Sequence, residues 1–223
     1  MQIAAHQLEA GVEDVVLEDG RASVRGAADR SVTLRDIAGA AYAGSRKLPK
    51  GMEPGLEMTR FYDPYFGSAS NAAHIVVVEV DVETCSVAIR RFVLVEDCGR
   101  MINPMIVEGQ AIGGVAQGIG AALLEEVVYS EDGQLLTGTL MDYLVPTARE
   151  LPLIEVLHLD RPSPATLGGF KGVGEGGTIG APAAIANAIA DALAPLGIDI
   201  TELPMTPDRL FTLIHQREKR TTP

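Results

Sequence analysis

The stretch GQAIGGVAQGIGAALLEEV, residues 109–127, is the part of the sequence from which the fold can be argued most directly. It lies in a longer segment, Met105 to Val128, that has small residues at many positions and that we expect to form a helix. Glycine costs an exposed helix roughly 1 kcal/mol at each position relative to alanine. Several glycines in one helix therefore predict that it packs closely against another backbone or against a ligand.

The residues before this helix predict a strand-turn-strand unit. Two runs rich in valine and isoleucine, AHIVVVEVD (73–81) and SVAIRRFVLV (86–95), are joined by a short turn that ends at Cys85. With 223 residues, the chain is long enough for one sizeable core or two small ones.

The first 70 residues predict a lead-in segment followed by a connector. Residues 1–45 indicate a short helix, a small hairpin around Asp19-Gly20, and a second helix with Thr33 as its N-cap. Prolines and scattered glycines then break the pattern up to about Asn71. Because disordered linkers are poor in aromatic residues, we interpret this part as an ordered connector with packed-down rings, namely Phe61, Tyr62, Tyr65 and Phe66.

The residues after the glycine-containing helix predict three further elements. A second hairpin is expected around Asp132-Gly133, followed by a proline-spaced extended section from Leu140 to Pro164. Helices are expected from about Pro182 to Leu193 and, at the end of the chain, from Pro207 to about Arg217. Helices mixed with antiparallel hairpins predict an α+β fold.

Composition and charge narrow the possible functions. The 30 acidic and 18 basic residues give a formal net charge of −12, which disfavours binding to nucleic acid or to an anionic membrane surface. The two cysteines, Cys85 and Cys98, are too few for a disulfide framework or a zinc site, so a cytoplasmic location is expected. No apolar run approaches the ~20 residues of a membrane helix. Small-molecule substrates and protein partners remain.

A second glycine-rich stretch, GGFKGVGEGGTIG (168–180), holds one carboxylate, Glu175, among seven glycines. Residues 172–177 match the dinucleotide fingerprint GxGxxG, but that fold needs an apolar strand leading into the first glycine. The residues before it, DRPSPATLGGFK, contain two prolines and no such strand, so we reject a dinucleotide-binding fold.

The glycine-rich stretch still has the properties of a ligand cradle. Glycines let backbone N–H groups approach an anionic or bulky ligand closely, and the helix that begins near Pro182 directs its first amides to the same region. A ligand could desolvate Glu175 and make it a stronger general base. The alternative is that Glu175 caps the helix or points into solvent, and spacing alone leaves both open.

Four segments, in this order and spacing, resemble the C-terminal part of the molybdenum-binding large subunit of the xanthine dehydrogenase, aldehyde oxidase and aerobic carbon monoxide dehydrogenase family. The resemblance covers roughly residues 1–200, and its two most specific pieces are GQAIGGVAQGIG and KGVGEGG. The segments are VEVDVET, VLVEDCGRMINPMIVEGQAIGGVAQGIGAALLEE, LMDYLVPTA and FKGVGEGGTIGAPAAIANAIADAL. The implied fold is the second half of the molybdopterin-binding domain, in residues 71–223.

The resemblance implies a role for each site residue. Glu175 corresponds to the catalytic general base, which takes a proton from a hydroxyl group on the metal. Gln110 corresponds to an amide that hydrogen-bonds the cofactor, although it could instead be a buried amide satisfied by the main chain. The backbone from Lys171 through Gly172 and Val173 to Gly174 is expected to line the cofactor. Because the pterin dithiolene holds the molybdenum, no protein ligand to the metal is expected.

The resemblance also implies partners and a reaction. The family's large subunit is several times longer, so the missing N-terminal half, an iron–sulfur subunit and an FAD subunit are expected on other chains. The expected cofactor is molybdenum–molybdopterin in its cytosine dinucleotide form, and the reaction is hydroxylation of an electron-poor C–H carbon in an aldehyde or N-heterocycle, or oxidation of carbon monoxide, with water as oxygen source. The alternative is a non-catalytic remnant or assembly subunit of such a complex.

Overall fold

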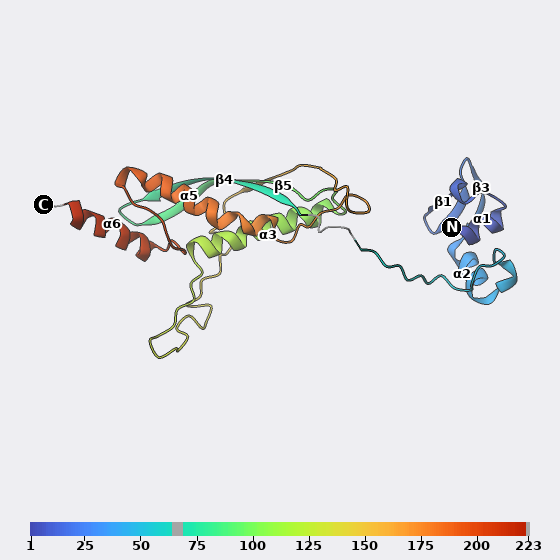
Figure 1. The fold of residues 1–223 in the computed structure, drawn as a ribbon, viewed down its shortest axis with the longest axis horizontal. Helices are drawn as coiled ribbons and strands as arrows, with labels where there is room; N and C mark the ends of the chain where they lie inside the picture. Colours follow the sequence, from blue (N-terminus) through green and yellow to red (C-terminus); the bar gives the residue numbers. More distant parts are fainter. Residues whose placement is uncertain (64–68, 222–223) are drawn as a thin grey trace. The chain divides into compact units, whose positions relative to one another are not determined.

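The computed structural model describes residues 1–63 and 69–221 (Figure 1). The chain divides into two compact units, Met1–Asp63 and Pro64–Pro223. Each unit has its own hydrophobic core. The interpretation of residues 71–223 as a molybdopterin-binding domain stays a prediction at this point.

The first unit packs two helices on a small antiparallel sheet. Asp19 and Gly20 both have positive φ, 45° and 75°, as the tightest hairpin turns require, and the predicted hairpin is confirmed. Thr33 accepts a hydrogen bond from the Asp36 amide in a capping box, as its position predicts. The third strand was not predicted. The elements are α1 (Gln2–Leu8), β1 (Val15–Glu18), β2 (Arg21–Val24), β3 (Ala27–Thr33) and α2 (Leu34–Ala43).

The connector differs from its prediction. Phe61 is 99% exposed and Tyr62 is 59% exposed, so the expectation that these rings are packed down is wrong. The physical reason is the lack of regular structure. Residues 57–63 form no helix or strand that would hold a ring against a core. Tyr65 and Phe66 lie outside the described residues.

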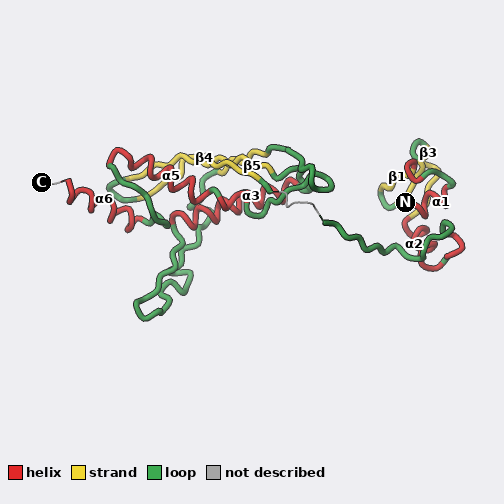
Figure 2. Tube along the Cα trace, viewed as in Figure 1, coloured by secondary structure: helices red, strands yellow, loops and turns green. Residues whose placement is uncertain are grey.

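The second unit is built on a three-stranded sheet in the order β4-β5-β6 (Figure 2). β4 (Asn71–Asp81) and β5 (Ser86–Asp97) form the predicted antiparallel pair, and β6 (Ile154–His158) joins β5 in parallel. β6 was not predicted, because it lies in the section expected to be extended and irregular. The glycine-containing helix α3 (Pro104–Leu123) and α5 (Ala181–Leu193) cover one face of this sheet (Figure 1).

The side chains that face the helices change in character along the strands. One row across the sheet, Val76, Phe92 and Ile154, is apolar and lies in the core. The row that ends this face contains Ala72, Glu96 and His158. The core of the second unit therefore passes from dry to polar within one sheet face. Its fully buried members include Phe92, Leu94, Val115, Ile119, Ile185, Ile189 and Leu193.

Residues 125–153, which we call the arm, loop out beyond the end of α3 (Figure 2). The arm contains no helix or strand, and the hairpin predicted around Asp132-Gly133 is reduced to one isolated bridge between Tyr129 and Leu135. The arm leaves large apolar side chains exposed, including Val127, Tyr129, Leu136, Leu140, Met141, Leu144, Val145 and Leu153.

The chain ends in an apolar helical run and an amphipathic helix. A short helix, α4 (Gly176–Ile179), leads into α5, and a turn of 3₁₀ helix extends the run to Leu196. By length and composition this run could cross a membrane, so the expectation that no apolar run approaches that length is wrong. The run is apolar because one face of α5 packs in the core, through Ala181, Ile185, Ile189 and Leu193. The last helix is α6 (Pro207–Thr221).

Candidate functional site

The glycine-rich stretch is pinned at its start to the end of β5. The Lys171 amide donates to the Cys98 carbonyl (2.9 Å), and Gly99 bridges Phe170. The Lys171 ammonium lies 2.7 Å from the Asp97 carboxylate, and this hydrogen bond is the main reason that the pKa of Asp97 is lowered. The side chain and the amide of Lys171 are thus both engaged within the chain.

Glu175 lies beside a pocket of about 230 Å³. It occupies the N-cap position of α4, but its side chain makes no capping hydrogen bond, and the residue is exposed. The alternative that Glu175 caps the helix is therefore wrong, whereas its exposure agrees with the alternative that it points into solvent. The pocket is lined by Ser70, Ala72, His74, Gly172, Val173, Gly174, Glu175, Gly176, Ile179 and Gly180.

The glycines on the two sides of Glu175 have different surroundings. At Gly172 and Gly174 no atom of the described chain lies within 4 Å of where a Cβ would stand, so this side is open. At Gly177 a Cβ would lie 2.3 Å from the Ala111 carbonyl oxygen of α3, which leaves no room for a side chain. Among the glycines of this stretch, Gly172 and Gly174 are thus the two that leave space for a ligand.

The glycines of α3 divide in the same way. A Cβ at Gly114 would lie 2.9 Å from the Gly177 Cα, and a Cβ at Gly118 would lie 2.5 Å from the Ala181 Cβ. The predicted close packing against another backbone is confirmed at Gly114, whereas Gly118 packs against the side chains of Ala181 and Pro182. Gly109 and Gly113 instead meet nothing within 4 Å in the described chain.

Gln110 lies between these two open glycines and is exposed. The alternative of a buried amide satisfied by the main chain is therefore wrong. Gln110 is not among the residues that line the Glu175 pocket, and neither is Lys171. The structure thus brings Gly172, Val173, Gly174 and Glu175 together around the pocket and leaves Gln110 on the open face of α3.

Two side chains of the sheet hold the peptide that follows Glu175. His74 of β4 lies 3.1 Å through Nε2 from the Gly176 carbonyl oxygen. Glu96 of β5 is 2% exposed, and a Cβ at Gly176 would stand 2.9 Å from its Oε2 atom. Burial raises the pKa of Glu96 and lowers that of His74, so both groups are driven toward their neutral forms.

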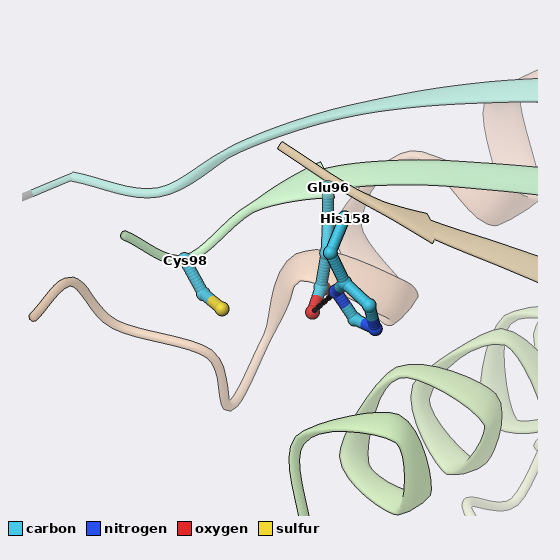
Figure 3. A group of neighbouring side chains, drawn as sticks. All are labelled: Glu96, Cys98 and His158. Atoms are coloured by element: carbon cyan, nitrogen blue, oxygen red, sulfur yellow. Dashed lines mark ion pairs between the residues drawn. The ribbon is translucent and has the colours of Figure 1, made fainter. Parts of the chain in front are cut away.

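Glu96, Cys98 and His158 form a cluster whose possible ligand atoms all lie within 4.8 Å of one another (Figure 3). Glu96 Oε1 and His158 Nδ1 are 3.4 Å apart, and Cys98 lies beyond the end of β5. Burial and the Glu96 carboxylate raise the pKa of the Cys98 thiol. Within the described chain the cluster is a buried polar group centred on the Glu96–His158 pair.

Sequence reasoning missed the roles of His74 and Glu96. The four histidines, His6, His74, His158 and His215, lie far apart in the sequence and so do not indicate a common site. The signal for Glu96 was present in the alternation of β5, since Phe92, Leu94 and Glu96 point to the same face and the first two are core residues. Nothing local marks His74, because its partner Gly176 is 102 residues away.

Comparisons with known proteins give one consistent result. Residues 1–152 match the family model described as "Molybdopterin cofactor-binding domain", a match that includes Gln110 and ends before Glu175. The chain is 48% identical over 208 residues to the nicotine 6-hydroxylase large subunit of Paenarthrobacter nicotinovorans, covering 93% of this chain and 26% of that protein. It is 39% identical to the carbon monoxide dehydrogenase large chain of Hydrogenophaga pseudoflava, covering 94% and 26%.

A solved structure supports the same relationship. Quinoline 2-oxidoreductase from Pseudomonas putida 86 superposes with a TM-score of 0.86 at 48% identity, covering 97% of this chain and 28% of that one. The chain spans about a quarter of the length of the curated relatives that it matches.

Proposed function

The chain belongs to the molybdopterin cofactor-binding family, as a part of the large subunits of xanthine dehydrogenase, aldehyde oxidase and carbon monoxide dehydrogenase type, and we propose that it forms one wall of a molybdenum hydroxylase active site. Its relatives are oxidoreductases of this kind. The alternative is a non-catalytic remnant or assembly subunit of such a complex.

The observation that carries the proposal is the open wall formed by residues 172–175. Gly172 and Gly174 leave free space where side chains would otherwise stand, and Glu175 presents an uncapped carboxylate at the same place. An anionic pterin cofactor is a ligand that backbone amides without side chains can approach. The residues present therefore fit the cofactor on this side.

Each residue of the wall has a proposed task. The backbone of Gly172, Val173 and Gly174 lines the cofactor, the Lys171 backbone continues this line outside the pocket, and the Gln110 amide hydrogen-bonds the cofactor from α3. Glu175 accepts a proton at a carboxylate oxygen as the general base. When bound, the molybdenum cofactor supplies the two-electron redox chemistry, and water supplies the oxygen.

The names of the relatives favour an N-heterocyclic substrate. The two matches at 48% identity are named for nicotine and quinoline, whereas the carbon monoxide dehydrogenase matches reach 39% or less. An electron-poor ring carbon next to nitrogen is therefore the proposed site of hydroxylation. The proposed cofactor form is the cytosine dinucleotide, and the proposed location is the cytoplasm, where the buried free thiols Cys85 and Cys98 remain reduced.

Two apolar surfaces support the proposed partners. The arm exposes a row of large apolar side chains, and the face of the sheet away from the helices exposes Ile75, Val77 and Leu157. Exposed apolar patches of this kind mark interaction surfaces. We assign them to the N-terminal part of the large subunit, while an iron–sulfur subunit and an FAD subunit would carry electrons away.

The proposal is tested by isolating the complex and changing Glu175. Purification from the native host should yield the chain with its partners, molybdenum and a released cytosine nucleotide, whereas the isolated chain should bind little molybdenum. In the complex, Glu175→Gln should retain molybdenum but lower kcat at least about 100-fold, because the base is removed. Full turnover of Glu175→Gln would contradict the base role, and stoichiometric molybdenum in the isolated chain would contradict a shared site.

A further inference from the structure

His74 lines the same pocket as Glu175 although it comes from a different layer of the fold. It lies on β4, in the same row of the sheet as Leu94 and Val156, and faces the helix layer. Its Nε2 atom is 3.1 Å from the Gly176 carbonyl oxygen. Because a carbonyl oxygen only accepts hydrogen bonds, Nε2 carries the hydrogen and donates it.

This hydrogen bond fixes the state of the imidazole. Burial lowers the pKa of His74, so the ring is neutral near pH 7 and carries a single hydrogen, on Nε2. The other ring nitrogen, Nδ1, is buried and has no hydrogen-bond partner among the described residues. The ring therefore has one polar contact within the described chain, and that contact is with the peptide after Glu175.

The glycines after Glu175 leave the space that side chains of the strands occupy. A Cβ at Gly180 would lie 2.4 Å from the His74 Cδ2 atom, so the ring occupies the space that a side chain would need. On the other side, the buried Glu96 carboxyl group lies against Gly176. Side chains of the strands therefore lie against the α4 backbone at Gly176, its first residue, and at Gly180, which follows its last residue.

We propose that His74 is a positioning residue for Glu175, holding the Gly176 carbonyl so that the carboxylate stays directed into the open side of the pocket. This inference rests on the proposed function, in which Glu175 is the base. His74 does not itself exchange protons with the substrate. Its contribution is geometric, because a reacting group displaced by about 1 Å can lose up to about 100-fold in rate.

Two substitutions in the complete complex separate the hydrogen bond from the shape of the ring. His74→Phe keeps an aromatic ring but removes the donor, and we expect kcat to fall about 10- to 100-fold with KM and molybdenum content unchanged. His74→Gln places an amide N–H near the Nε2 position, and we expect it to restore most of kcat. Equal losses in both variants, or a kcat for His74→Phe within twofold of the wild type, would overturn the inference.

Phe92→Leu serves as the matched control for packing. Phe92 is fully buried and meets the His74 ring edge to face, with the two ring centroids 5.9 Å apart. Its side chain cannot hydrogen-bond the Gly176 carbonyl. We expect this change to lower the unfolding temperature and leave kcat per molybdenum intact. A loss of kcat as large as in His74→Phe would show that His74 acts only through packing.

Hydrogen exchange tests the same inference without an activity assay. Amides of the peptide covering residues 176–180 should exchange faster in His74→Phe than in the wild type or in His74→Gln, and unchanged exchange would overturn the inference. Glu175→Gln, assayed in parallel, keeps the two proposals apart. If Glu175→Gln is fully active, the base role fails; if Glu175→Gln is inactive and His74→Phe is fully active, only the positioning role fails.

Discussion

Around the Glu175 pocket, one group of glycines is packed against the fold and another group faces open space. Gly114 and Gly177 bring α3 and α4 together so closely that a Cβ at either would overlap backbone atoms of the other. Gly113 directly precedes Gly114, and Gly174 lies three residues before Gly177, yet a Cβ at Gly113 or Gly174 would meet no described atom within 4 Å. Glycines that are close in the sequence can therefore serve different requirements, one for helix packing and one for open space.

The contrast indicates how the proposed cofactor wall is built from a glycine-rich sequence. The packed glycines fix where α3 and α4 lie, and they do so without side chains that could adjust. The open glycines then present bare backbone at a place that the packed ones have fixed. A substitution at a packed glycine should therefore lower the stability of the chain, whereas a substitution at an open glycine should lower cofactor binding.

The largest expected effect is at a packed position. Gly177→Ala would place a Cβ 2.3 Å from the Ala111 carbonyl oxygen and 3.0 Å from the Val115 amide, both of them backbone atoms of α3. Separating the two helices should cost about 3 kcal/mol of the free energy of unfolding. Denaturant unfolding of the 223-residue chain measures this cost, with Gly174→Ala as the control that should unfold like the wild type.

The next effect belongs to an open position and should appear only when the cofactor is bound. Gly174→Val leaves the isolated chain as stable as the wild type, because nothing in the described chain is near the new side chain. In the assembled complex the same side chain stands where the cofactor is proposed to lie, so affinity should fall about tenfold or more. The measurement is the molybdenum content per complex. An unchanged content would contradict the proposal that the cofactor lies beside Gly174.

A pH experiment tests whether the packed side is as dry as its contacts indicate. Glu96 has its pKa raised by burial above its ordinary value of 4.5, so the folded chain binds this proton more tightly than the unfolded chain. Stability should then fall as the pH rises from about 4.5 through the raised folded value. Glu96→Gln removes the ionisation, so its advantage in unfolding temperature over the wild type should be larger at pH 8 than at pH 4. An equal difference at both pH values would indicate a hydrated carboxyl group.

The smallest expected effect is a gain. Gly113→Ala fills open space on α3 and should stabilise the isolated chain by roughly 0.5–1 kcal/mol, since alanine favours the helix. Gly114→Ala, one residue further, should destabilise the same chain because its Cβ meets the Gly177 backbone. Denaturant unfolding measures the change in the free energy of unfolding for both variants. Changes of the same sign would contradict the distinction between open and packed glycines.

The sequence predicts those parts of the fold that depend on neighbouring residues. The Asp19-Gly20 turn, the Thr33 cap and the β4–β5 pair all have local causes, namely backbone conformation, a side chain three residues away and alternating β-branched residues. β6 has no such cause. Its five residues become a strand only because β5, about 60 residues earlier, offers a free edge.

The candidate site was predictable in part for the same reason. Glu175 is conspicuous as a lone carboxylate among glycines, and Gln110 belongs to a recognisable pattern. Which glycines are open and which are packed depends on the partner helix, and no spacing within one segment reveals it. His74 is hidden still more completely, because its function depends on a contact between β4 and the start of α4.

The arm also bears on how long an unassembled copy survives in a cell. Leu140 and Met141 are 78% and 86% exposed on backbone without regular structure. Exposed apolar side chains are what chaperones bind, and irregular surface loops are preferred sites of proteolytic cleavage. We therefore expect the arm to act as a degradation signal in a copy that lacks the proposed partners, so that cellular quality control would keep the amount of this chain matched to theirs.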